Sequence, residues 1–497
     1  MDRSEAGVNH PTASLLELDP GLNYLPDRLR TIHLIGICGT AMGSLAGMLV
    51  ERGYAVTGSD ANVYPPMSDF LAGLGLRVAS GYDGRNLDHR PDLVLVGNVV
   101  TRKNPEAIRL KELALPYLSL PQALRLIFLK DKKPLVVAGT HGKTTTSALA
   151  AWLLEAAGLE PGFMVGGLLG NYGRNYNLGA GDWFVVEGDE YDTAFFDKGP
   201  KFLHYAPLVG VLTSIEFDHA DIFADFEAVQ EAFKKFVRLI PANGLLVAWG
   251  DDPLVRRLSE PASSKIIYYG LNPDNDWRAV NLRPDGRRTW FDLITPDHDR
   301  RRRDLFSPLP GEHNVLNTLA VIAALDWAGL PPERLRPGLE TFAGVKRRQE
   351  VRGLAAGITV IDDFAHHPTA VSRTIAAIRA AYNGSRLVAV FEPRTNTSRR
   401  RVFQADYAEA FDLADAILVR EPPDLAKIAE GERFSSLRLV QDLNARGLAA
   451  GYFPDTDSLL TCLLEQARAG DVVLIMSNGG FDNLHQRLLD GLAGSAA

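Results

Sequence analysis

Short apolar runs and helix-forming stretches alternate along almost the whole chain. Each apolar run has the length of a buried strand, and the alanine- and leucine-rich stretches between the runs favour helices. This alternation indicates α/β domains built on parallel sheets. The predicted strands cover residues 32–37, 56–60, 92–100, 135–138, 183–186, 209–215, 244–248, 358–361, 386–391 and 471–476, and the predicted helices cover 41–52, 121–129, 147–157, 318–328 and 369–382.

The segment after the fourth predicted strand carries the strongest chemical signal. It reads Gly-Thr-His-Gly-Lys-Thr-Thr-Thr from Gly139 onward and precedes a predicted helix. Glycines let several backbone N–H groups converge on a phosphate, Lys143 adds a point charge, and the Thr144 hydroxyl suits Mg²⁺. The general G-x-x-x-x-G-K-[ST] pattern fails, because Val137 stands five residues before Gly142. We predict a triphosphate site; the alternative is a glycine turn with a surface lysine.

Two further strands end in acidic or histidine-bearing segments. The strand at 183–186 leads into four carboxylates, the first of which is Glu187, and the strand at 209–215 leads towards His219. Ligands bind at the carboxyl ends of strands in α/β sheets, and Mg²⁺ prefers carboxylate oxygens. Glu187 is therefore the predicted Mg²⁺ ligand, against a solvated acidic loop. His219 is a predicted metal ligand, against a structural histidine.

The first two strands flank a glycine-bearing turn. Gly36, Gly39 and Gly43 follow the spacing G-x-x-G-x-x-x-G, which departs from the dinucleotide fingerprint G-x-G-x-x-G. An NAD site is therefore disfavoured, and another diphosphate at the helix N-terminus is favoured. Asp60 ends the second strand, where it would either bind a ribose hydroxyl or close a turn.

Amide and basic side chains mark the second half of the chain. Asn314 and Asn317 begin a predicted helix, where they would bind a base edge or where Asn314 would cap the helix. The basic cluster at 346–348 could reach phosphates. Beyond it, three strands end in polar loops that should share the ligand edge of one sheet. These loops cover residues 362–368, 392–397 and 477–481.

The length and net charge of the chain indicate how many domains it has and which ligands are disfavoured. A chain of 497 residues predicts about three domains, and a net charge of −8 disfavours nucleic-acid binding. Neither a signal peptide nor an apolar run long enough for a membrane is found, and Cys38 and Cys462 are far apart. A cytoplasmic protein without membrane insertion is expected. The expected divisions are a loosely ordered leader at 1–28 and domains at 29–133, 134–342 and 343–497, and the polar stretch 270–306 is expected to be a small sheet insertion or a loop.

The order and spacing of these motifs resemble the ATP-dependent Mur ligases over nearly the whole chain. The resemblance implies a Rossmann-like domain that binds a UDP-sugar, a P-loop ATPase-like central domain and a doubly wound C-terminal domain that binds the amine substrate. It implies two Mg²⁺ sites held by Thr144, Glu187 and His219, and catalytic roles for Lys143, Glu187, His219 and Arg347. The implied ATP-binding residues are Gly139, Thr140, His141, Gly142, Lys143, Thr144, Thr145, Asn314, Asn317, Arg347 and Asp363.

Two further residue sets follow from the resemblance. The implied UDP-sugar site consists of Gly36, Cys38, Gly39, Thr40, Met42 and Asp60, and the implied peptide site consists of Arg394, Asn396, Ser477 and Asn478. The segments 190–197, 391–397 and 476–481 are similar to those of members that join L-alanyl-γ-D-glutamyl-meso-diaminopimelate to UDP-N-acetylmuramate through an acyl phosphate. The alternatives are a ligase that adds L-alanine to the same nucleotide and a non-catalytic nucleotide-binding regulator. The expected state is a monomer or weak dimer.

Overall fold

The computed structural model describes residues 16–217, 223, 225–296, 302–423 and 425–495. The chain divides into two compact units, one of which contains residues 1–130 and 192–199 and the other residues 131–191 and 200–497. Among the described residues, no helix combines the length and apolar character that a bilayer crossing requires.

The first unit contains a five-stranded parallel sheet with the strand order β3-β2-β1-β4-β5. Every residue of β4 is buried, as expected for a central strand covered on both faces. The predicted Rossmann-like arrangement is confirmed. Its elements are β1 (Thr31–Ile35), α1 (Thr40–Glu51), β2 (Ala55–Asp60), α2 (Met67–Gly73), β3 (Val78–Ser80), β4 (Leu93–Val96), α3 (Pro105–Leu113), β5 (Tyr117–Ser119), α4 (Leu120–Ala123) and a π-helix at Leu124–Leu129.

Two segments of this unit differ from the expected division. The described part of the expected leader is packed: Leu18 is buried in the apolar core, and the Asn23 side chain donates to the Tyr117 carbonyl at 2.9 Å. A hairpin from far along the chain, β10 (Asp192–Ala194) and β11 (Asp197–Pro200), also contributes Phe196, whose ring lies 4.8 Å from that of Tyr117. Residues 1–15 lie outside the described residues.

The central module of the second unit is a ten-stranded sheet with the order β17-β16-β15-β14-β13-β12-β6-β9-β7-β8. Its middle strands are parallel, and β15, β16 and β17 extend it, with β16 antiparallel to both of its neighbours, which confirms the predicted sheet insertion. Its strands are β6 (Lys133–Ala138), β7 (Gly162–Met164), β8 (Tyr176–Asn177), β9 (Trp183–Gly188), β12 (Val209–Leu212), β13 (Leu245–Trp249), β14 (Lys265–Gly270), β15 (Trp277–Asp285), β16 (Arg288–Ile294) and β17 (Arg302–Ser307).

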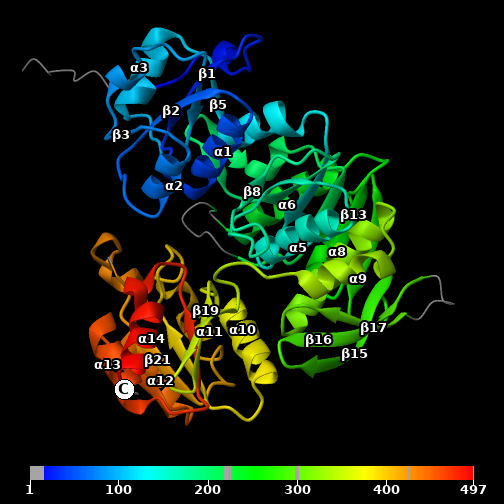
Figure 1. Cartoon of the computed structure of the whole chain (residues 1–497), viewed down its shortest axis with the longest axis vertical. Coiled ribbons are helices and arrows are strands. Elements are labelled where there is room, and N and C mark those ends of the chain that lie inside the picture. Colours follow the sequence, from blue (N-terminus) through cyan, green and yellow to red (C-terminus); the bar gives the residue numbers. More distant parts are fainter. Residues whose placement is uncertain (1–15, 218–222, 224, 297–301, 424, 496–497) are drawn as a thin grey trace, which may run out of the picture. The chain divides into compact units, whose positions relative to one another are not determined.

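Helices from distant parts of the chain complete the central core (Figure 1). Apolar residues of α5 and α8 pack with those of the sheet in one continuous cluster, which explains why both helices are almost entirely buried. The helices of this module are α5 (Lys143–Ala156), α6 (Phe226–Leu239), α7 (Pro253–Ser259), α8 (Glu312–Trp327) and α9 (Pro332–Thr341).

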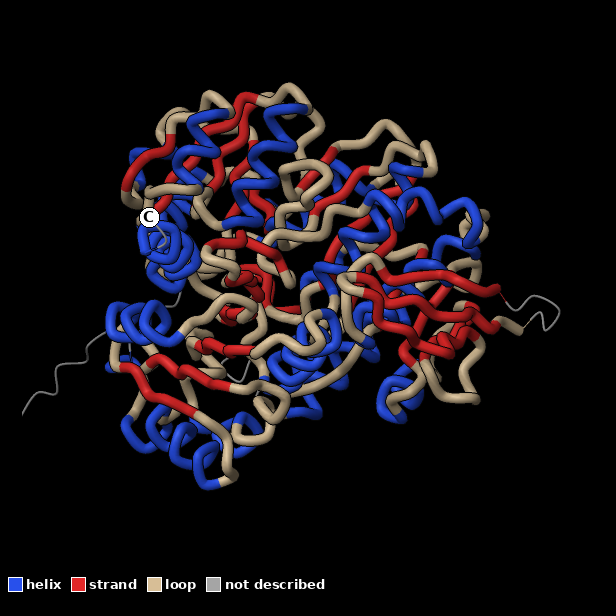
Figure 2. Tube along the Cα trace, turned by 60° about the horizontal axis from the view of Figure 1, so that its bottom comes forward, coloured by secondary structure: helices blue, strands red, loops and turns tan. Residues whose placement is uncertain are grey.

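The C-terminal module contains a six-stranded sheet with the order β18-β19-β23-β20-β21-β22, antiparallel only at β18–β19. Two apolar cores lie on its opposite faces, one with α10, α11 and α12 and the other with α13 and α14. Figure 2 shows helices and strands side by side near the marked C-terminus. This doubly wound arrangement confirms the expectation. The elements are β18 (Glu350–Ala355), β19 (Ile358–Asp363), α10 (Pro368–Ala381), β20 (Leu387–Phe391), α11 (Gln404–Tyr407), β21 (Ala416–Arg420), α12 (Ser436–Ala445), β22 (Ala450–Phe453), α13 (Thr456–Gln466), β23 (Val472–Met476) and α14 (Leu484–Ser495).

Several strands end earlier than their apolar runs predict. β1 ends at Ile35 and β12 at Leu212, although buried residues continue to Ile37 and Ile215. The backbone leaves the ladder at these points: the N–H groups of Gly36 and Ile37 both donate to the Ser59 carbonyl. The apolar residues beyond the ladder therefore anchor the loops at the carboxyl edges, where the candidate site residues lie.

Candidate functional site

The phosphate loop connects β6 to α5 through two glycines with positive φ. Gly139 has φ +132° and Gly142 has φ +83°, a region that side chains rarely adopt. A Cβ at Gly139 would lie 2.1 Å from Thr213 Oγ1, and one at Gly142 would lie 2.6 Å from Asn317 Oδ1. Both positions therefore require glycine, and the loop curls over the start of α5 as the sequence predicted.

Lys143 lies inside a carboxylate cage at the first residue of α5. Its Nζ donates to the Gly139 carbonyl at 2.6 Å and to Glu190 Oε2 at 3.0 Å. Burial by itself lowers the pKa of Lys143, but the charges of Glu190 and Asp189 outweigh burial and hold that pKa above its ordinary value. Lys143 is therefore charged, and its ammonium group is held by one carboxylate and one carbonyl.

Glu187 is a half-buried carboxylate near the end of β9. Its Oε1 accepts a hydrogen bond from the Gly166 N–H at 2.7 Å. Burial and the neighbouring charge of Asp189 raise the pKa of Glu187, so this position favours a cation. A Cβ at Gly167 would meet the Thr144 side chain at 3.1 Å, so Thr144 and Glu187 both lie against the same Gly166–Gly167 segment. Thr144 and Glu187 thus offer a hydroxyl and a carboxylate near one segment, and such oxygen donors suit Mg²⁺.

Arg348 lies at the phosphate loop, whereas sequence reasoning named Arg347. Arg348 Nη2 is 3.3 Å from Thr144 Oγ1, and burial lowers the pKa of its guanidinium. Arg347 Nη2 instead donates to the carbonyls of Ser477 and Gly479, each at 2.6 Å. Two adjacent arginines point to different places because Arg347 has φ +61°, which turns the chain between them.

The two asparagines lie within α8 and do not cap it. Gly311 is the N-cap residue and makes no side-chain capping bond, so the predicted alternative of a cap by Asn314 is wrong. Asn314 Nδ2 donates to the Pro310 carbonyl at 2.8 Å, and Asn317 Nδ2 donates to Asn314 Oδ1 at 3.2 Å. The buried pair faces the phosphate loop through the contact of Asn317 with Gly142.

Asp363 ends β19 and is held by backbone groups. Its carboxylate accepts hydrogen bonds from the N–H groups of Gln349 and Ala365, both at 2.8 Å. Burial raises the pKa of Asp363 despite the nearby charge of Arg348. Arg347 and Asp363, the two ATP-binding residues predicted beyond the central module, thus make contacts with the C-terminal module itself.

A cluster that sequence reasoning did not assemble joins three distant segments. Glu216 Oε2 lies 3.4 Å from His141 Nε2 and 3.5 Å from His367 Nδ1, and it accepts a hydrogen bond from Thr369 Oγ1 at 2.7 Å. Burial by itself raises the pKa of Glu216, but the neighbouring His141 and Thr369 side chains lower it to about 2. His219, which was the predicted ligand in this stretch, lies outside the described residues.

The loops at the carboxyl edge of the C-terminal sheet meet at Glu392. This fully buried carboxylate accepts hydrogen bonds from Ser477 Oγ at 2.7 Å and Arg420 Nη1 at 2.5 Å, and Arg394 Nη1 lies 3.4 Å away. A Cβ at Gly479 would strike the Arg394 side chain at 2.1 Å. Three strand ends are therefore joined at one acidic residue, which sequence reasoning had not singled out.

The other two residues predicted for the peptide site lie in the same loops. Asn396 Oδ1 accepts a hydrogen bond from Arg399 Nη2 at 2.9 Å. Among the described residues, the buried Oδ1 of Asn478 has no hydrogen-bond partner. A buried amide oxygen without a partner is costly, so a donor on a ligand would be favoured there.

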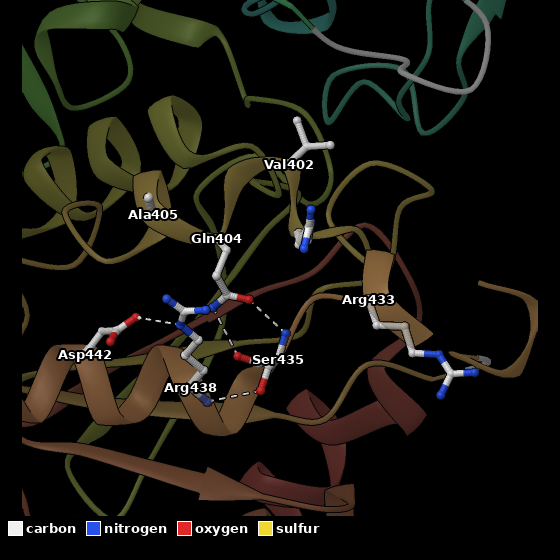
Figure 3. A pocket seen from close by; sticks show the side chains of 9 residues that line it. Val402, Gln404, Ala405, Arg433, Ser435, Arg438 and Asp442 are labelled. Atoms are coloured by element: carbon white, nitrogen blue, oxygen red, sulfur yellow. Dashed lines mark hydrogen bonds and ion pairs between the residues drawn. The ribbon is translucent and has the colours of Figure 1, made fainter. Parts of the chain in front are cut away.

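A hollow of about 500 Å³ lies in the C-terminal module, between the segments at 401–405 and 431–442. Figure 3 shows Gln404, Ser435, Arg438 and Asp442 as one connected group, with Arg433 beside them. Gln404 exchanges two hydrogen bonds with the Ser435 backbone, at 2.9 and 3.1 Å. Arginines contribute most of the charge in this hollow. Its lining residues are Arg401, Val402, Gln404, Ala405, Gly431, Arg433, Ser435, Arg438 and Asp442.

The glycine turn of the first unit has a different electrostatic character. Gly36 has φ +82°, Gly39 is the N-cap of α1, and no side chain caps that helix. Asp60 Oδ2 accepts a hydrogen bond from the Cys38 N–H at 2.9 Å, and its Oδ1 accepts one from the Asn62 N–H at 3.0 Å. Asp60 therefore braces the turn in the structure, which agrees with the alternative of a strand-end turn. Thr40 and Met42 lie in the first turn of α1.

These features define an α/β nucleotide-binding enzyme with a shortened phosphate loop. Family models for the Mur ligase family, catalytic domain (residues 31–131), the Mur ligase middle domain (137–325) and the Mur ligase, glutamate ligase domain (347–479) all match the chain. The chain belongs to the Mur ligase family, and the predicted ATP-dependent ligase class is confirmed.

Individual relatives cover almost the whole chain. It is 42% identical over 94% of its length to the UDP-N-acetylmuramate–L-alanyl-γ-D-glutamyl-meso-2,6-diaminoheptandioate ligase of Escherichia coli, 99% of which is covered. It is 36% identical over 91% of its length to the UDP-N-acetylmuramate–L-alanine ligase of Variovorax paradoxus, 93% of which is covered. The solved murein peptide ligase of Psychrobacter arcticus is 35% identical, with a TM-score of 0.69 over 93% of this chain and 99% of that one.

Proposed function

We propose that this ligase joins the tripeptide L-alanyl-γ-D-glutamyl-meso-diaminopimelate to UDP-N-acetylmuramate in cell-wall recycling, with ATP as the energy source. The observation that carries the proposal is the 42% identity, over 94% of the chain, to a relative named for that peptide and nucleotide. The sugar-nucleotide carboxylate would attack the γ-phosphorus and give an acyl phosphate and ADP. The peptide amine would then displace phosphate and form the amide.

Two anions, a carboxylate and a triphosphate, have to approach each other for this reaction. Lys143 and Arg348 supply positive charge at the phosphate loop, and pre-placed charges of this kind lower a barrier without reorganisation. Thr144 and Glu187 would hold Mg²⁺, which would neutralise further phosphate charge. The raised pKa of the half-buried Glu187 carboxyl supports that assignment. A second Mg²⁺ site with His219 stays a prediction.

The C-terminal module would bind the peptide. A tripeptide with glutamyl and diaminopimelyl residues carries several carboxylates, which match the arginines Arg401, Arg433 and Arg438 around the hollow. Arg394 and Asn478 lie at the neighbouring strand ends and would contact the peptide closer to its amine. The predicted contacts of Asn396 and Ser477, the cytoplasmic location and the monomeric or weakly dimeric state stay predictions.

Amine selectivity tests the proposal directly. Purified protein would be given ATP, Mg²⁺ and UDP-N-acetylmuramate with either the tripeptide or L-alanine, and ADP release would be measured. We expect at least tenfold higher kcat/KM with the tripeptide. Preference for L-alanine would assign the activity of the other relative, which is 36% identical. Absence of ADP release with both amines would favour a non-catalytic nucleotide-binding regulator.

A further inference from the structure

We infer that His141, Glu216 and His367 form a binding site for one Zn²⁺-like divalent cation, separate from the Mg²⁺ position at Thr144 and Glu187. Their ligand atoms all lie within 4.8 Å of one another. The inference does not depend on which amine the ligase uses.

The separations of the ligand atoms fit a small tetrahedral ion. Metal–ligand bonds of about 2.0–2.1 Å to nitrogen and oxygen place neighbouring tetrahedral ligands about 3.3–3.4 Å apart. Glu216 Oε2 lies 3.4 Å from His141 Nε2 and 3.5 Å from His367 Nδ1. Two edges of the tetrahedron are therefore nearly formed, and binding requires only that the two imidazoles move closer together.

The surroundings of the cluster also favour a ligand. His367 is buried, and the His141 and Glu216 side chains are only 17% and 28% exposed. Among the described residues, the buried Nε2 of His141 has no hydrogen-bond partner, although it faces the Glu216 carboxylate. A buried nitrogen that faces a carboxylate oxygen without a hydrogen bond would gain from a cation between them.

The donor set selects the type of metal. Imidazole suits Zn²⁺, Co²⁺ and Ni²⁺, whereas Mg²⁺ requires mostly oxygen ligands in an octahedral arrangement. Three protein ligands would leave a fourth position for water or substrate. Second contacts already orient the ligands: Thr369 Oγ1 donates to Glu216 at 2.7 Å, and the Phe403 ring packs 4.6 Å from that of His367.

The three ligands come from elements that are far apart in sequence. His141 belongs to the phosphate loop, Glu216 follows β12 in the central module, and His367 is the N-cap residue of α10 in the C-terminal module. The Thr140 hydroxyl and the Glu216 backbone also exchange hydrogen bonds at 2.9 and 3.2 Å. A bound ion would therefore fasten the phosphate loop to the start of α10.

Cobalt binding tests this site without any substrate. Tag-free full-length protein would be stripped with a chelator and titrated with Co²⁺ in the presence of excess Mg²⁺, and the visible d–d absorption of the ion would be recorded. Zn²⁺ binding would be measured by calorimetry. We expect one strong site per chain, displacement of Co²⁺ by Zn²⁺ and a higher Tm with Zn²⁺.

The variants decide whether these residues hold the ion. His367→Ala and Glu216→Gln should each lower Co²⁺ affinity at least tenfold and remove the Tm increase. His366→Ala is the matched control, because this adjacent histidine is outside the cluster, and it should keep the site. If His367→Ala does not fold, Glu216→Gln still decides the result. Absence of Co²⁺ binding, or equal binding by folded Glu216→Gln and the parent protein, would overturn the inference.

Discussion

The two glycine turns of this protein use the same backbone device for different electrostatic tasks. Both follow a parallel strand and precede a helix, and both contain a glycine with positive φ, Gly36 in one and Gly142 in the other. The first turn is braced by Asp60 and has no lysine within it. The second carries Lys143, with Arg348 nearby and three carboxylates around it. The backbone supplies anion-binding N–H groups in both turns. The side chains around each turn determine how negatively charged a ligand it favours.

The largest expected effect comes from removing the cation of the second turn. Lys143→Ala should reduce kcat for ADP formation by about 10²–10³-fold or more, the loss seen when one preorganised charge is removed from a reacting centre. UDP-N-acetylmuramate binding, measured by calorimetry, should change little because the Gly36 turn belongs to the other compact unit. Lys265→Ala, at an exposed strand position, is the control. Normal turnover by Lys143→Ala would refute the proposed role of the loop.

The second largest effect is expected at Glu187, where one substitution should lower activity and raise the stability of the metal-free protein. Glu187→Gln should abolish the Mg²⁺-dependent rise in Tm and lower activity about 10–100-fold, because one oxygen ligand loses its charge. Without metal, the variant should have the higher Tm. A carboxyl whose pKa is raised in the folded state costs stability when it is ionised, and this cost disappears as the pH falls towards its ordinary pKa of 4.5.

The pH dependence supplies the control for this variant. The Tm difference between Glu187→Gln and the parent protein should be largest at pH 8 and should shrink as the pH approaches 4.5 in scanning calorimetry. Asp182→Asn, an exposed carboxylate paired with Lys133, should show no such trend. A constant Tm difference across this range would contradict the raised pKa assigned to Glu187.

The adjacent arginines sharpen the comparison further. Arg348→Ala should raise KM for ATP about tenfold, because it removes the guanidinium that contacts Thr144 at the phosphate loop. Arg347→Ala should leave KM for ATP within about threefold. It should instead lower Tm, since Arg347 bonds two carbonyls of the loop at 477–479. Steady-state kinetics and thermal unfolding of both variants provide the measurements, and a reversed pattern would restore the sequence-based assignment of Arg347.

The parts of the site that lie close together in the sequence could be predicted, and the parts that only the fold brings together could not. The phosphate loop and the strand end at Glu187 were predictable, because glycine, lysine and carboxylates follow apolar runs within a few residues. The choice between Arg347 and Arg348 depends on one backbone angle, φ +61° at Arg347, which no residue pattern encodes. Glu216 and its two histidine neighbours are joined only by tertiary packing, as is the hairpin at 192–199 that belongs to the first unit.

The smallest expected effect lies in the first turn. Asp60 accepts one hydrogen bond from the Cys38 N–H and another from the Asn62 N–H, at 2.9 and 3.0 Å. An asparagine at this position has a single acceptor oxygen and turns an NH₂ group towards one of these donors. Asp60→Asn should therefore lose one hydrogen bond, which contributes about 1 kcal/mol, and KM for UDP-N-acetylmuramate should rise about fivefold.

The KM for ATP shows whether Asp60→Asn affects only the Gly36 turn. If Asp60 braces only the Gly36 turn, Asp60→Asn leaves KM for ATP and the Mg²⁺ dependence unchanged. The control is Asp69→Asn on the exposed face of α2, which should change KM for neither substrate. If Asp60 also bound a ribose hydroxyl, Asp60→Asn would weaken UDP-N-acetylmuramate binding more than it weakens the turn. The stability of the turn is measured by hydrogen-exchange protection of the Cys38 N–H. Equal losses in exchange protection and in substrate binding identify a brace, because a broken turn weakens the N–H array and the ligand together.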